Sequence, residues 1–111
     1  MKVKYIKNAV ICHTYLGIGD YGYLTAIISA EHDSGNTGLG THDLRYPPYG
    51  INYIVKIMEV LGVGSWEELK GTYCRIKRYE DETLVIGHII KDQWFYPEGV
   101  AAKYKSNKQG E

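Results

Sequence analysis

Residues 17–32, GIGDYGYLTAIISAEH, decide the fold. Their first half matches the GxGxxG spacing, which binds the pyrophosphate of a dinucleotide when a helix follows the glycines. Here the next residues alternate instead, and one face collects Leu24, Ala26, Ile28 and Ala30. A period of two is typical of a strand. The glycines therefore predict the loop of a β-hairpin, and a dinucleotide-binding fold is not expected.

Strands are predicted on both sides of this loop. Residues 3–16 are rich in β-branched and aromatic side chains, which indicates one long strand with a bulge near Asn8. A turn at residues 33–36 leads into TGLGTHDLRY, a short third strand. Gly38 and Gly40 leave its backbone bare, which favours either a bulge or the close approach of another chain or a ligand.

The main helix is predicted after the segment YPPYG, residues 46–50, whose prolines exclude regular structure. Apolar residues then recur at helical spacing up to Gly62. The main apolar stripe consists of Ile51, Ile54, Val55, Met58 and Leu61, and the polar side of Asn52, Lys56 and Glu59. The stripe is widened by Tyr53, Ile57 and Val60. The wide stripe indicates either that part of the helix meets a second copy of the chain or that the helix sinks deeper into its own core.

The C-terminal half predicts a short helix and another hairpin. The sequence SWEE at Ser65 is a capping box, so a short helix is expected from Trp66 to Gly71. Residues 72–79 and 84–90 predict two strands joined by an acidic turn at 80–83, which we interpret as solvated turn residues and not as a metal site. The second strand is uniformly apolar and is expected to be central and covered. The chain is then expected to leave the sheet at Lys91 and Asp92.

These elements predict an α+β fold: an antiparallel sheet of about five to six strands with one main helix and one short helix. Residues 1–102 are expected to form a single domain, and the polar residues 103–111 a disordered tail.

Charge and composition exclude several classes of protein. The 13 basic residues balance 13 acidic ones, so a polymeric nucleic acid is not an expected partner. The longest uncharged, mostly apolar stretch, residues 9–18, is too short to cross a bilayer, and no signal peptide is visible. Cys12 and Cys74 are far apart and indicate two reduced thiols. A cytoplasmic protein without membrane contact is therefore expected.

Catalytic and metal-binding patterns are weak in this chain. The four histidines never occur at HxxxH or HExxH spacing, so no metal is expected. His42 and Asp43, with Ser29 or Cys12 folded nearby, would resemble a hydrolase triad. Because the sequence contains no nucleophile elbow, we do not expect an enzyme, and a small nucleotide hydrolase stays an alternative.

A mixture of bare glycines, tyrosines and cations just before the main helix is the better candidate site. Loop N–H groups and a helix N-terminus suit an anion, tyrosine rings suit a base, and arginine suits a diphosphate. The candidate ligand-binding residues are Gly40, Thr41, Asp43, Arg45, Tyr46, Tyr49, Asn52 and Arg75. The alternative is that residues 46–49 simply cover the end of the helix. Arg75 and Arg78 are expected on opposite faces of their strand, so only one of them could reach the site.

Four stretches together resemble a known family: YLGIGDYGYLTAII, TGLGTHDL, VGSWEELKGTYCRIK and IGHIIKDQWFYP. They are similar to small phage proteins of the type of the first described Thoeris anti-defence sponge, over most of residues 3–97. After the third-strand glycine this chain has Gly40-Thr41-His42, where Gly-Gly-Tyr would be expected. The resemblance implies a homo-oligomer that catalyses nothing, needs no cofactor and sequesters a cyclic ADP-ribose variant made by a bacterial TIR-domain enzyme.

On this resemblance we assign expected roles to the candidate residues. Arg45 and Arg75 would meet phosphates, and Tyr46 or Tyr49 would stack on adenine. Hydrogen bonds to ribose or base edges would come from Asn52, Asp43 and Thr41. The alternative from another class is a phage inhibitor that binds a host nuclease or another protein through its tyrosine-rich surface.

Overall fold

The computed structural model describes residues 2–41, 43–46 and 50–96. Its described part contains the predicted antiparallel sheet, with six strands in the order β3-β2-β1-β4-β5-β6. The strands are β1 (Val3–Ile18), β2 (Leu24–His32), β3 (Gly35–Gly40), β4 (Tyr73–Tyr79), β5 (Leu84–His88) and β6 (Trp94–Phe95). One helix, α1 (Ile51–Leu61), and a single 3-10 turn, η1 (Trp66–Glu68), complete the α+β fold.

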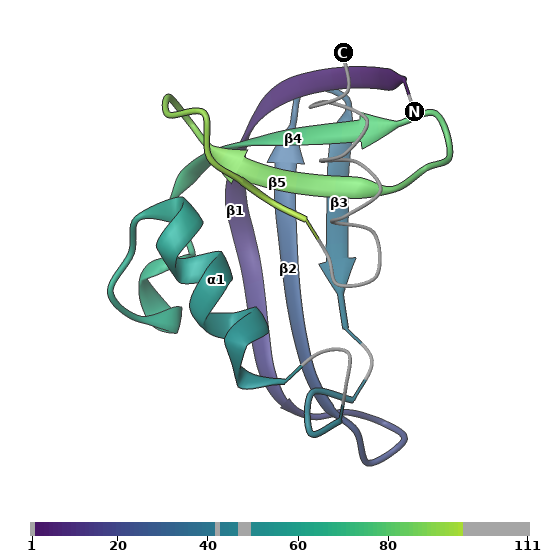
Figure 1. Ribbon diagram of the computed structural model, residues 1–111, viewed down its shortest axis with the longest axis vertical. Coiled ribbons are helices and arrows are strands. Elements are labelled where there is room, and N and C mark those ends of the chain that lie inside the picture. Colours follow the sequence, from purple (N-terminus) through teal and green to yellow (C-terminus); the bar gives the residue numbers. More distant parts are fainter. Residues whose placement is uncertain (1, 42, 47–49, 97–111) are drawn as a thin grey trace.

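The long strand β1 joins two parts of the sheet that run in different directions (Figure 1). Its first half pairs with β4 and its second half with β2. The register with β2 shifts between Ile11 and His13, where one extra residue sits in β1. A bulge of this kind bends and twists its strand. Asn8 pairs regularly with Arg75, so the bulge predicted near Asn8 is wrong.

Both predicted hairpins are confirmed. Residues 17–22 close the β1–β2 hairpin, where the Gly19 N–H donates to the Tyr23 carbonyl at 2.8 Å and Gly22 adopts a positive φ of 77°. A strand, not a helix, follows these glycines. The residues with GxGxxG spacing therefore form a hairpin turn here. β4 and β5 pair across the acidic turn, where Glu82 also has a positive φ, of 72°.

The apolar face of α1 packs on the concave side of the sheet, but with a different stripe from the one predicted. Tyr53, Ile57 and Val60, which widen the stripe, are buried in the core of their own chain, as the second of the two alternatives predicts. Ile51 and Val55 of the predicted stripe are instead 71% and 40% exposed. The covered side of α1 is the one that packs with core residues of β1, β2, β4 and β5.

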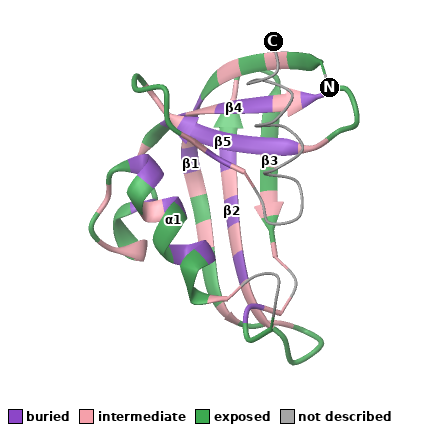
Figure 2. Ribbon diagram, in the orientation of Figure 1, coloured by how far each residue is buried: buried purple, intermediate pink, exposed green. Residues whose placement is uncertain are grey.

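β5 is covered on both faces, as its uniformly apolar sequence predicts (Figure 2). Leu84 and Ile86 belong to the main core, whereas Val85 packs on the opposite face with Tyr79, beside Trp94 and Tyr96. The chain leaves the sheet close to Lys91 and Asp92, as predicted, but its return to the sheet was not predicted. Residues Trp94–Phe95 return and pair with Ile86 and Gly87 as β6.

The capping box and the short helical turn are found where the sequence predicts them. The Glu68 carboxylate accepts hydrogen bonds from the N–H groups of Gly64 at 2.6 Å and Ser65 at 3.1 Å. The turn is a 3-10 helix of three residues, shorter than the expected helix up to Gly71. Within the described ranges no helix has the length and apolar run needed to cross a bilayer.

Candidate functional site: a groove between α1 and β6

The loop that follows β3 is fastened to β2 by its own side chains. The Thr41 hydroxyl accepts from the Ala26 N–H at 3.0 Å, and Asp43 Oδ1 accepts from the Leu24 N–H at 3.3 Å. These oxygens take the places that strand carbonyls would occupy further along the ladder. Two of the predicted ligand-binding residues, Thr41 and Asp43, therefore extend the sheet pairing beyond Gly40.

Arg45 is engaged by the same carboxylate. Its Nε lies 3.0 Å from Asp43 Oδ1 and its Nη2 lies 2.7 Å from Oδ2, a paired geometry, and Nη2 also donates to the Gly22 carbonyl at 3.2 Å. Hydrogen bonds from the Arg45 guanidinium lower the pKa of Asp43 from 3.8 to about 2. This pair joins the loop to the β1–β2 hairpin, and the guanidinium predicted to hold phosphate already faces a carboxylate.

We predict that the Asp43 carboxylate contributes to stability in a defined range of acidic pH. Its folded-state pKa lies below the unfolded value, so the contribution is full above about pH 4 and is lost as the pH falls towards 2. Urea unfolding of Asp43→Asn across this range is expected to show a shallower fall in the free energy of unfolding than the parent protein. Asp20→Asn, in an exposed turn residue, is the matched control and should keep the parent slope.

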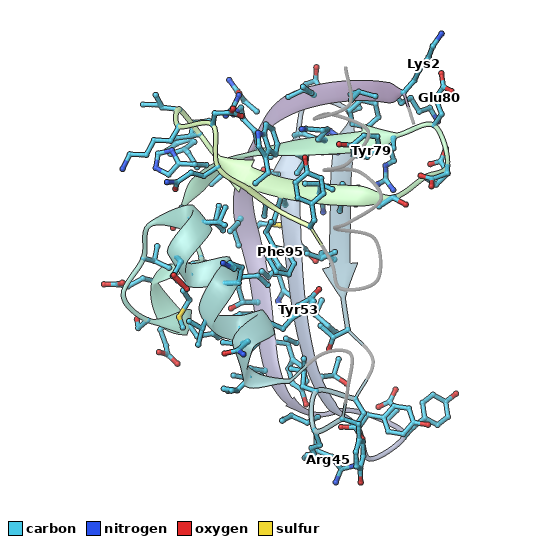
Figure 3. All side chains as sticks on the ribbon, viewed as in Figure 1. Lys2, Arg45, Tyr53, Tyr79, Glu80 and Phe95 are labelled. Atoms are coloured by element: carbon cyan, nitrogen blue, oxygen red, sulfur yellow. The ribbon has the colours of Figure 1, made fainter. Side chains whose placement is uncertain are left out.

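The structure does not gather all of the predicted site residues. Gly40 and Tyr46 are exposed near the loop, and Tyr49 lies outside the described residues. Arg75 lies on β4, whereas Arg45 lies at the opposite end of the molecule (Figures 1 and 3). Asn52 lies in the first turn of α1 and faces a different feature, the groove described next.

A groove of about 600 Å³ runs between α1 and the segment that contains β6. Its α1 wall consists of Asn52, Tyr53, Lys56, Glu59 and Val60, and its other wall of Asp92, Gln93, Trp94, Phe95 and Tyr96. Tyr53 and Phe95 meet edge to face at 4.8 Å between the ring centroids (Figure 3). This volume is within the range of small-molecule sites. We call it the α1–β6 groove.

Four of the polar side chains along this groove, Asn52, Lys56, Glu59 and Gln93, have no partner within the described part of the chain. Asn52, Lys56 and Glu59 follow each other at spacings of four and three, so they form one ridge along α1. Gln93 faces this ridge from the opposite wall. The side chains of these four exposed residues make no hydrogen bond or ion pair with described residues. The polar side of the helix therefore borders a hollow, and its hydrogen-bonding groups are not used by any described residue.

Trp94 is held in place from several directions. Its ring lies over Gly87, where an added Cβ would come within 2.8 Å of several ring atoms. The Arg75 guanidinium lies 4.6 Å and the Lys77 ammonium 3.9 Å from the ring centroid, and its Nε1 donates to Asp92 at 2.9 Å. Such cation–π contacts stabilise the ring position. This wall of the groove is therefore formed before any ligand arrives.

The cations that hold Trp94 are themselves fixed. Arg75 donates to the carbonyls of His88 and Lys91, each at 2.8 Å, which uses the side chain that was expected to meet phosphate. Lys77 is only 6% exposed and also lies within 6 Å of the rings of Tyr79 and Tyr96. The sequence pattern does not predict this cluster, although Gly87 in an apolar strand is a signal of close approach.

Of the hydrolase-like group considered from the sequence, His42 and Asp43 with Ser29 or Cys12, the structure shows the Cys12 thiol donating to the Ser29 carbonyl at 3.5 Å. Burial raises the pKa of the Cys74 thiol to about 12, so this thiol stays protonated at neutral pH. Asp43 is paired with Arg45, and its neighbour His42 lies outside the described residues. No group of three or more His, Cys, Asp or Glu residues that could hold a metal ion occurs among residues 2–41, 43–46 and 50–96.

Comparisons with protein-family models, with curated proteins and with solved structures find no match for this chain. The resemblance to sponge proteins therefore stays a prediction, and the function is argued from the groove.

Proposed function

We propose that this protein is a phage anti-defence factor that binds a cyclic adenine nucleotide signal in the α1–β6 groove and sequesters it intact. The observation that carries the proposal is the convergence of four polar side chains, none paired with a described residue, around a hollow with aromatic walls. Amide groups can form hydrogen bonds with the edge of a base, and a carboxylate can accept hydrogen bonds from ribose hydroxyls. Aromatic rings can pack against the apolar surface of the ligand. Sequestration requires binding alone, which agrees with the protonated thiol and the occupied carboxylate described above.

Ligand binding should raise the melting temperature of the protein. In a thermal-shift screen of cyclic and linear adenine nucleotides, a ligand at a hundred times its dissociation constant is expected to add about 2.7 kcal/mol of stability. Mass spectrometry of the recovered ligand should show it unchanged. A consumed nucleotide would contradict sequestration and favour the hydrolase alternative.

The groove is tested by removing one of its amides. Asn52→Ala is expected to weaken nucleotide binding by about three- to tenfold in calorimetry, because one hydrogen bond is lost. Asn36→Ala, an exposed asparagine on β3, is the matched control and should leave the affinity unchanged. Equal affinity in both variants would remove the α1–β6 groove from the proposal.

One surface favours the second candidate function, direct binding of a host nuclease or other defence protein. The tip of the β1–β2 hairpin presents Ile18 and Tyr21, which are 61% and 87% exposed. Arg45 links this tip to Tyr46, which is 61% exposed, because its guanidinium lies 5.5 Å from the tyrosine ring. Exposed tyrosines of this kind are enriched in protein interfaces. No nucleotide shift, together with loss of anti-defence activity in Tyr21→Ser, would favour this candidate.

Self-association through the wide helix stripe stays part of the proposal, and the part of that stripe left exposed is the candidate surface. A second copy meeting α1 would contact Ile51 and Val55, which are exposed, and not the buried stripe. Sedimentation velocity of the parent protein and of Ile51→Ser would detect such an assembly.

A further inference from the structure

We infer, resting on the proposed function, that the α1–β6 groove recognises the ribose and base of its ligand and leaves the phosphates in water. The charge of the groove points to this division. Among the described residues that line the groove, Lys56 is the one cation. Two lining residues, Glu59 and Asp92, carry carboxylates. A diphosphate in the groove would therefore meet one ammonium beside two carboxylates, because Arg75 and Lys77 lie against the Trp94 ring and are not among the lining residues.

The arginines of the chain support the same conclusion. All three guanidinium groups already have hydrogen-bond partners outside the groove. Arg45 pairs with Asp43, and Arg75 binds the carbonyls of His88 and Lys91. Arg78 donates to the Tyr5 and Thr37 hydroxyls and to the Glu82 carbonyl. The guanidinium fork is the side chain best suited to a diphosphate. None of the three lines the groove.

The groups that do face the groove suit a nucleoside. Asn52 and Gln93 each carry a donor and an acceptor, the pair that an adenine edge presents in complementary order. The Glu59 carboxylate can accept hydrogen bonds from both hydroxyls of a ribose. Acidic residues have this role in dinucleotide sites. Apolar surface from Val60 and Tyr96 lies beside these groups. The groove therefore offers contacts for a sugar and a base, and a single ammonium for any anion.

The inference is tested by comparing adenosine, ADP-ribose and inorganic pyrophosphate in calorimetry. Adenosine is expected to bind within about tenfold of ADP-ribose, and pyrophosphate should not displace either. The dissociation constants should change less than about threefold between about 50 and about 300 mM salt, because screening affects charge pairs most. Binding of ADP-ribose with adenosine more than about a hundredfold weaker overturns the inference and leaves the proposed function standing. Failure of every adenine compound to bind overturns both.

Two charge-removing substitutions separate the roles of the α1 side chains. Glu59→Gln should weaken adenosine binding by about tenfold or more, because a charged acceptor for ribose is lost. Lys56→Gln should change it by less than about threefold. Glu67→Gln on η1, an exposed glutamate outside the groove, is the matched control and should bind like the parent. A large loss in Lys56→Gln with no effect of Glu59→Gln would contradict the inference.

Discussion

Ile57→Ala is expected to lower the free energy of unfolding by about 3 to 4 kcal/mol, the largest effect we predict for a single substitution. Ile57 is 1% exposed, and it packs in the core cluster that α1 shares with the sheet. Removing its side-chain carbons leaves a cavity that the curved sheet cannot easily close. Urea denaturation followed by circular dichroism measures the change.

The control for this substitution lies on the same helix. Val55→Ala removes apolar carbons from a side chain that is 40% exposed, and alanine favours the helix, so a change of less than about 1 kcal/mol is expected. Similar losses in the two variants would mean that the buried face of α1 is not the one described. The pair therefore tests the orientation of the helix, on which the position of the groove ridge depends.

Gly87→Ala is expected to destabilise the protein by about 2 to 3 kcal/mol. A Cβ at this position would lie 2.7 Å from Trp94 Cδ2, closer than carbon atoms can approach, so the indole ring must move. Moving the ring breaks its contacts with Arg75 and Lys77. It also disturbs the pairing of β6 with β5, because Trp94 belongs to β6. Thermal unfolding measures the loss, and a change in tryptophan fluorescence should accompany it.

Gly40→Ala is the matched control, because nothing lies within 4 Å of a Cβ added there. Its stability should stay within about 0.5 kcal/mol of the parent. If the displaced Trp94 opens the wall of the groove, Gly87→Ala should also lose nucleotide binding, whereas Gly40→Ala should keep it. Retained binding in Gly87→Ala would show that the groove tolerates a displaced Trp94.

The predicted ligand site illustrates what sequence spacing can and cannot show. The residue types near Arg45 predict a nucleotide site because their side chains suit phosphate, ribose and base. Residue type alone does not show which of these side chains already have hydrogen-bond partners within the fold. The loop folds back on β2, so Thr41, Asp43 and Arg45 bind one another or the backbone. Asn52 was chosen for its place at the start of the helix, and it is the predicted residue that lies in the groove.

The groove was not predictable because its second wall was not. The polar residues at the start of segment 91–96 predict that the chain leaves the sheet there. The strand that forms after them, β6, is only two residues long. Its return depends on contacts between segments distant in the sequence: Trp94 over Gly87, and Phe95 against Tyr53. The lone glycine in an apolar strand was the available signal, but it did not identify the ring that covers it.

The sequence by itself determined the strands, the hairpin loops and the helix, because alternation, turn glycines and helical spacing are local properties of the chain. It also excluded a dinucleotide-binding reading of residues 17–22, since a strand pattern follows them. Only the tertiary structure decided which face of α1 is buried, that Trp94–Phe95 rejoins the sheet, and where polar groups without a partner among the described residues border a hollow. These features depend on how the bent strand β1 brings two parts of the sheet around one helix, and that bend is a property of long-range packing.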